Sequence, residues 1–387
     1  MLPFLLLLVF FLLKIGGRLV GFVWAPWLIL LVFSDPVILG QTALISPDIV
    51  LVAFFLMTLE GLWAKRRWLI LLGILGLCAI SMRGMMTSAA LFVWAVVLPF
   101  ISKRSFRRLL TTGLPFLPGF VFSSWFLVWH FKTTGWIGYH QNSPWAGAFQ
   151  LVSIPGFMRN IAVVAWRWVD FGRVGELIFL VLVLYSSKWR SFSDKKAAFL
   201  PLKAVFSLLI CLLIFLLPSA FLHQNLSAHR YFLPAFLVTH FLVLVLITRM
   251  EVVEASKKWL LSGLVFLLAT GNCWIYPVGI SMDWDSTLAH KPYHGLRSEA
   301  ISYLTENSID FTDVGTEFPN INSGENLMLN GDERQFSKRN FEWNRYVMAS
   351  NIYNDFSKQD IQRLQEGWSL IWQSEKKGVW IRIYARK

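Results

Sequence analysis

Long apolar runs, separated by short basic or polar breaks, dominate the chain before Ser281. Runs such as Val20–Phe33 and Ile49–Trp63 carry at most one charged residue. Such runs are typical of helices that enter a bilayer, where a full crossing takes roughly 20 residues. The pattern predicts about nine or ten transmembrane helices in an α-helical polytopic membrane domain, residues 1–280. From Ser281 onward the runs are short and polar turns intervene, so we predict a separate small α/β domain, residues 281–387.

The C-terminal part of the chain shows both helical and strand patterns. SEAISYLTEN (Ser298–Asn307) and KQDIQRLQEGW (Lys358–Trp368) have helical spacing, whereas GVWIRIYARK (Gly378–Lys387) alternates as a strand does. About 100 residues suffice for a separate hydrophobic core. This part of the sequence contains no Gly-rich phosphate loop, no Cys/His cluster and no nucleophile motif. We interpret it as a lid or docking domain without chemistry of its own.

The chain opens with a run, Leu2–Leu13, that is too short to cross a bilayer. It lacks the basic start and the small-residue cleavage site of a signal peptide. We interpret it as the trailing part of a transmembrane helix that ends in a basic turn at Lys14 and Arg18. The sequence is therefore expected to be truncated at its N-terminus, or to have a misplaced start.

Composition agrees with a membrane protein, since 56% of the residues are hydrophobic and the mean hydropathy is +0.54. The net charge of +13 resides in short basic clusters between apolar runs. That placement favours the positive-inside rule over a nucleic-acid-binding face. The three cysteines, Cys78, Cys211 and Cys273, lie in apolar segments, which argues against a disulfide framework or a thiolate metal site.

The distribution of Lys and Arg predicts the orientation. Before Ser281, most of these residues fall in alternate turns, which we assign to the cytoplasmic side. The Asp35–Asp48 segment and the C-terminal domain then face outward. The longest connecting segment, Lys132–Val174, is predicted as an outer loop with interfacial pieces because it is rich in Trp.

The polar segment DPVILGQTALISPD interrupts two apolar runs and begins and ends with a carboxylate, Asp35 and Asp48. A carboxylate at the membrane boundary is a candidate for function because it is costly to keep beside hydrocarbon. Alternatively, Asp48 only caps the helix that follows Pro47. The local sequence leaves both interpretations open.

Further candidates lie at the predicted outer ends of helices. Arg83, in SMRGMM, either binds a lipid phosphate or extends to water as a lone interfacial arginine does. His229, Arg230 and Tyr231 place a titratable ring, a cation and an aromatic ring at one helix start, which favours function. Glu60 lies about one turn from the inner interface and is interpreted as structural.

In their order, these motifs resemble the GT-C membrane glycosyltransferases. The nearest branch is the bacterial family 39 group, related to protein O-mannosyltransferases and lipid A aminoarabinose transferases. In that family a Pro and a Pro-Asp flank an outer loop, a Lys- or Arg-Gly step follows, and Arg-Tyr-x-x-Pro opens a late helix. The resemblance covers Met1 to about Ile280. The matching positions are Pro36, Pro47-Asp48, Arg83-Gly84, Arg230, Tyr231 and Pro234.

The resemblance implies transfer of a sugar from a polyprenyl-phosphate donor to a glycan, lipid or protein acceptor at the outer face of the bacterial cytoplasmic membrane. Such chemistry needs a base for the acceptor hydroxyl and cations for the departing phosphate. The resemblance leaves open whether the reaction uses a divalent metal ion as cofactor, and we predict no metal-ligating residues in this sequence. Asp48 is expected to be catalytic, by supporting the base or binding the acceptor. The expected substrate-binding residues are Asp35, Arg83, His229, Arg230 and Tyr231.

One departure from the family leaves other functions open. Family members carry an acidic pair in a first outer loop, which would precede Met1, and nothing in this sequence replaces it. The chain is therefore expected to be a fragment, or to lack the catalysis of its relatives. An O-antigen polymerase or ligase would share the donor. A transporter would show internal repeats and charges near the bilayer midplane, neither of which the sequence shows, and a membrane scaffold would leave the outer polar cluster unexplained.

Overall fold

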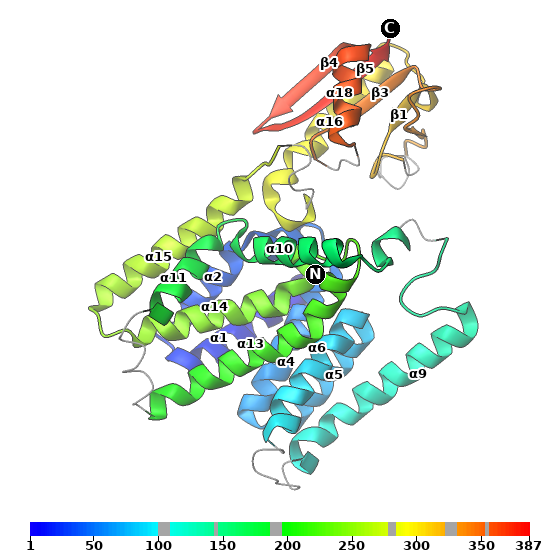
Figure 1. Ribbon diagram of the computed structural model, residues 1–387. Helices are drawn as coiled ribbons and strands as arrows, with labels where there is room; N and C mark the ends of the chain where they lie inside the picture. Colours follow the sequence, from blue (N-terminus) through cyan, green and yellow to red (C-terminus); the bar gives the residue numbers. More distant parts are fainter. Residues whose placement is uncertain (100–108, 143–145, 186–195, 278–283, 322–330, 353–355) are drawn as a thin grey trace. The chain divides into compact units, whose positions relative to one another are not determined.

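The computed structural model describes residues 1–99, 109–142, 146–185, 196–277, 284–321, 331–352 and 356–387. These residues form two compact units, Met1–Gly271 and Asn272–Lys387. The predicted domain boundary, between residues 280 and 281, lies outside the described residues. The first unit is helical and the second contains a small sheet (Figure 1).

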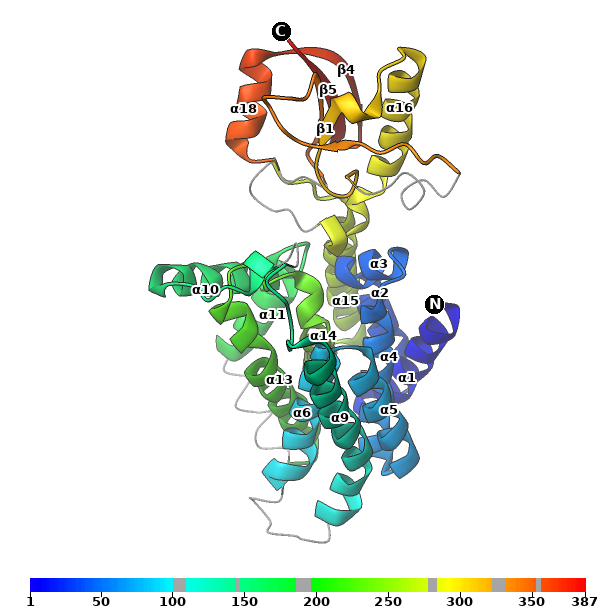
Figure 2. The same cartoon turned by 90° about the vertical axis from the view of Figure 1, so that its right-hand side faces the viewer.

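Helix α14 is the centre of the first unit, because every residue from Leu233 to Ile247 is buried. It contacts helices from both halves of the unit, including α1, α2, α4, α11, α13 and α15. α10 contacts α11 and α13 and lies to one side of this group (Figure 2). The helices are α1 Leu2–Val20, α2 Ala25–Ser34, α3 Pro36–Ala43, α4 Pro47–Ala64, α5 Arg67–Ile80, α6 Met82–Phe92, α9 Leu117–Thr134, α10 Ile154–Val169, α11 Val174–Tyr185, α13 Lys196–Leu222, α14 Leu233–Arg249 and α15 Glu254–Thr270.

Among the described residues, five helices are long and apolar enough to cross a membrane, which suggests a membrane protein. A sixth candidate is the pair α2–α3, which bends by 67° at its break. The sequence predicted nine or ten crossings. Part of the difference comes from α5 and α11, which are apolar but have only 14 and 12 residues. At 1.5 Å per residue, both are shorter than the hydrocarbon core of a bilayer.

The first helix extends further than predicted. α1 continues past Lys14 to Val20, so the predicted basic turn at Lys14 and Arg18 is wrong. A buried stripe with helical spacing extends from Leu8 to Leu19, and its packing maintains the helix beyond the apolar run. Arg18 lies in the last turn, where its guanidinium forms two hydrogen bonds of 2.8 Å with the Glu60 carboxylate of α4.

The Asp35–Asp48 segment, predicted as an outer loop, contains a helix, α3. Asp35 caps α3, because its Oδ1 accepts a hydrogen bond of 2.8 Å from the Val37 backbone N–H. The cap of α4 is Ser46, whose hydroxyl accepts from the Asp48 N–H at 3.2 Å. The capping role considered for Asp48 therefore belongs to Ser46, and the Asp48 carboxylate is available for another contact.

The second unit holds a five-stranded sheet in the order β2-β1-β3-β5-β4. β1 runs parallel to β2 and β3, whereas β5 is antiparallel to β3 and β4. Both predicted helices and the predicted C-terminal strand are confirmed, as α16, α18 and β5. The elements are α16 Pro292–Glu306, β1 Val314–Thr316, β2 Ser337–Lys338, β3 Tyr346–Ser350, α18 Lys358–Gly367, β4 Trp368–Lys376 and β5 Val379–Arg386.

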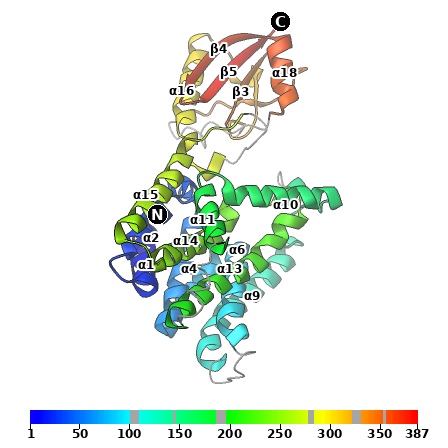
Figure 3. The same ribbon diagram turned by 60° about the vertical axis from the view of Figure 1, so that its left-hand side comes forward.

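The two helices of this unit cover opposite faces of the sheet (Figure 3). Leu296 of α16 belongs to the same buried cluster as Ile383 of β5, and Leu364 of α18 to the same cluster as Tyr384. Since successive strand residues point to opposite faces, the alternation in GVWIRIYARK reflects two hydrophobic faces rather than one exposed face.

α5 and α6 form a hairpin in which the backbones approach closely. Ser81 caps α6 by accepting from the Gly84 N–H at 3.2 Å. A Cβ atom at Gly84 would overlap the carbonyl oxygen of Leu77 on α5. The glycine therefore determines where the neighbouring Arg83 lies.

We expect Gly84→Ala to lower the free energy of unfolding by about 1–3 kcal/mol, because α5 and α6 must separate to admit the methyl group. Gly263→Ala is the matched control, since a Cβ there meets nothing within 4 Å on α15. Alanine is the better helix former, so the control should be neutral or stabilising. Thermal unfolding of both variants in the same detergent tests this, and equal melting temperatures would contradict it.

Candidate functional site

Four of the six predicted site residues come together, from three segments of the first unit. Asp48 lies in the first turn of α4, Arg83 in the first turn of α6, and Arg230 and Tyr231 in the short 3₁₀ turn η5, His229–Phe232. We call these four residues the Arg83 cluster.

Arg83 makes the contacts that join this cluster. Its Nη1 lies 2.8 Å from Oδ1 of Asp48 and donates to the Arg230 carbonyl at 3.4 Å. The Arg83 guanidinium also lies over the Tyr231 ring, 4.5 Å from its centre, and the Arg230 guanidinium lies 5.5 Å from the same centre. Two cations thus share one aromatic ring beside one carboxylate.

Exposure divides the cluster into a buried anchor and accessible cations. The Asp48 side chain is 5% exposed and that of Arg83 is 27% exposed, while Arg230 and Tyr231 are half-buried. Asp48 Oδ2 also lies 3.2 Å from the Ser46 hydroxyl, so both carboxylate oxygens have partners. Both polar contacts of Arg83 use Nη1, and within the described residues its other N–H groups make none. This arrangement can bind an anion.

The other two predicted residues, Asp35 and His229, lie in a second group that we call the buried charge network. In it, Arg173 forms a bidentate pair with Asp35, from Nε to Oδ2 at 2.8 Å and from Nη2 to Oδ1 at 3.0 Å. His240 stands between two carboxylates, with Nδ1 2.7 Å from Glu176 Oε1 and Nε2 3.4 Å from Asp35 Oδ2. The network comprises Asp35, Asp170, Arg173, Glu176, His229 and His240, and each is at most 2% exposed.

The polar groups around Asp35 are arranged in a chain. Its carboxylate pairs with the Arg173 guanidinium, and the His240 ring stands between it and the Glu176 carboxylate. Arg173 further packs on the Phe236 ring of α14 at 4.1 Å. Buried charges are tolerated only when paired in this way, so these contacts hold α2, α3, α11 and α14 together.

His229 belongs to this network although it precedes Arg230 in the chain. Its Nε2 lies 3.1 Å from Asp170 Oδ2, and its ring packs 5.0 Å from that of Phe171. Asp170 Oδ1 in turn accepts from the Phe171 N–H at 2.8 Å. The buried His229 therefore anchors η5, while Arg230 and Tyr231 of the same turn are accessible.

Sequence reasoning missed Asp170, Arg173, Glu176 and His240. The first two lie within the segment that was predicted as an outer loop, of which Ile154–Val169 is the helix α10. His240 had a usable signal, because it is an ionisable residue inside the apolar run FLPAFLVTHFLVLVL. Within the described residues, no group of three or more His, Cys, Asp or Glu side chains is arranged to hold a metal ion.

Comparison with protein-family models, with curated proteins and with solved structures found no match for this chain.

We expect Arg173→Gln to destabilise the protein by about 3–5 kcal/mol, because it leaves the Asp35 carboxylate buried without its charged partner. The matched control is the double variant Asp35→Asn/Arg173→Gln, which removes both charges and keeps a side chain able to cap α3. The double variant should lose less unfolding free energy than Arg173→Gln alone. Thermal unfolding in detergent measures both, and additive losses from the two single changes would contradict the pairing.

Proposed function

We propose that this chain is a membrane glycosyltransferase, which moves a sugar from a polyprenyl-phosphate donor to an acceptor at the outer face of the bacterial cytoplasmic membrane. The observation that supports this most directly is the Arg83 cluster, where two accessible cations stand beside a buried carboxylate. Its four residues are among those that carry the resemblance to family 39 enzymes. A polyprenyl phosphate offers an anionic group that such cations bind.

In this proposal Arg83 and Arg230 hold the phosphate of the donor. When the bond from the sugar to the phosphate breaks, negative charge grows on the leaving phosphate, and fixed cations stabilise that charge. Asp48 supports this by orienting Arg83. Because both oxygens of Asp48 already have partners, we assign it this positioning role in place of deprotonating the acceptor.

The charges at the two ends of α4 support an outward-facing cluster. Asp48 lies at the start of this helix, and its other end leads into the basic turn Lys65-Arg66-Arg67. Cytoplasmic turns carry the excess of Lys and Arg in membrane proteins. The Arg83 cluster then lies at the extracytoplasmic end, where a flipped lipid-linked donor would present its phosphate.

A transporter is the second candidate, and one observation favours it. The pair α2–α3 is bent at Asp35, and the Asp35 carboxylate lies in a network of buried ionisable residues. Broken helices with ionisable residues at the break are typical of secondary transporters. An O-antigen polymerase or ligase would use the same donor class as the proposed transferase, and its acceptor would be a second lipid-linked glycan.

We expect the purified full chain to release polyprenyl phosphate from a polyprenyl-phosphate sugar when membrane extract supplies acceptors. A panel of mannose, glucose and aminoarabinose donors tests this. Arg83→Gln and Arg230→Gln should each lower the rate about tenfold to a hundredfold, because each removes a charged hydrogen bond to the phosphate. Arg159→Gln is the control, since Arg159 donates to the Gln224 carbonyl at 3.0 Å, outside the cluster.

Three other outcomes would contradict the role of the Arg83 cluster or favour another class of protein. Unchanged release in both variants would remove the Arg83 cluster from the reaction. If no donor turns over and proteoliposomes containing the protein accumulate a solute, the transporter is the better assignment. Transfer onto a lipid-linked glycan alone would identify the polymerase or ligase class.

A further inference from the structure

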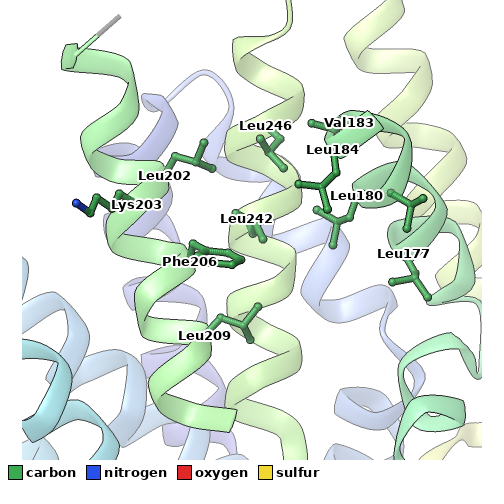
Figure 4. Close-up of a pocket in the computed structure, with 11 residues that line it drawn as sticks. Leu177, Leu180, Val183, Leu184, Leu202, Lys203, Phe206, Leu209, Leu242 and Leu246 are labelled. Carbon is green, nitrogen blue, oxygen red and sulfur yellow. The ribbon is translucent and has the colours of Figure 1, made fainter. Parts of the chain in front are cut away.

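An apolar cavity of about 440 Å³ lies between α11, α13 and α14 (Figure 4). Its walls include Leu180 from α11, Leu209 from α13, and Leu242 and Leu246 from α14. Lys203 is the one charged residue among the described residues that line it. The volume falls within the range of ligand pockets, and a cavity with walls of this kind excludes water.

The cavity opens sideways, between α11 and α13. Three residues that line it, Val181, Leu184 and Phe206, are 41%, 60% and 53% exposed. These two helices are apolar on their exposed sides, and in a bilayer such sides face hydrocarbon. A lipid chain can therefore enter the cavity without crossing a polar surface.

The cavity is remote from the Arg83 cluster. Arg230 lies in η5, which directly precedes α14, whereas Leu242 and Leu246 lie 9 and 13 residues beyond the first residue of α14, Leu233. At 1.5 Å per residue they lie about 14 and 20 Å along the helix axis from that end. This places the cavity towards the end of α14 that leads to Lys257 and Lys258, which is the basic end of the unit.

We propose that this cavity binds an acyl chain of an anionic glycerophospholipid from the leaflet at the basic end. The aliphatic stem of Lys203 contributes to the rim, while its ammonium group points away from the cavity (Figure 4). A lysine in this position can place its charge at the headgroup level and bind a lipid phosphate. The inference does not rest on the proposed transferase activity, because it needs neither Arg83 nor a sugar donor.

The first test narrows the mouth of the cavity in the full chain. Val181→Trp puts a large ring at an exposed position of the cavity wall. Because this side chain is not in the buried core, the variant should fold as the unchanged protein does. Leu182→Trp is the control, since Leu182 is 64% exposed on the same helix and does not line the cavity. After delipidation and addition of dioleoylphosphatidylglycerol, native mass spectrometry should show one tightly bound lipid fewer in Val181→Trp than in the control. Equal lipid counts would overturn the proposal.

The second test concerns the headgroup. Lys203→Gln should reduce the preference for dioleoylphosphatidylglycerol over dioleoylphosphatidylcholine about fivefold, the effect of one basic residue near an anionic surface. Lys258→Gln, at an exposed position on α15, is the control and should keep the preference. An unchanged preference in Lys203→Gln, or an equal loss in both variants, would overturn the anionic assignment.

Discussion

The bidentate pair of Asp35 and Arg173 is the interaction on which the helical unit depends. Both side chains are almost completely buried, and a charge in such a place is stable only beside its partner. Asp35 stands at the break between α2 and α3 and also caps α3, so the pair keeps the bend of this segment. Through His240 it also connects to α14, the most deeply buried helix.

Much of the architecture could be predicted from local sequence, because apolar runs and alternation report on each element separately. The strand GVWIRIYARK and the two helices of the C-terminal unit are examples. The order of motifs also singled out Asp48, Arg83, Arg230 and Tyr231, which the fold brings together. Each of the four lies in the first turn of a helix or in the 3₁₀ turn before one, where polar residues stand out against apolar runs.

What could not be predicted depends on contacts between distant segments. Asp35 and Arg173 are 138 positions apart, and no periodicity in either segment indicates the other. At the N-terminus, the length of the apolar run predicted a helix that is too short. Packing against the rest of the bundle extends α1 beyond this run, past Lys14. Tertiary packing decides such boundaries, and local composition does not report it.

The turn η5 shows how the two polar groups depend on each other. His229 is fixed by Asp170 in the buried charge network, and the next two residues form half of the Arg83 cluster. A 3₁₀ turn has about three residues per turn, so neighbouring side chains point in clearly different directions. The network can therefore position Arg230 although none of its other members belongs to the Arg83 cluster. Because Arg83 donates to the Arg230 carbonyl, a shift of η5 would move both cations, so the spacing of the two cations depends on buried residues outside the Arg83 cluster.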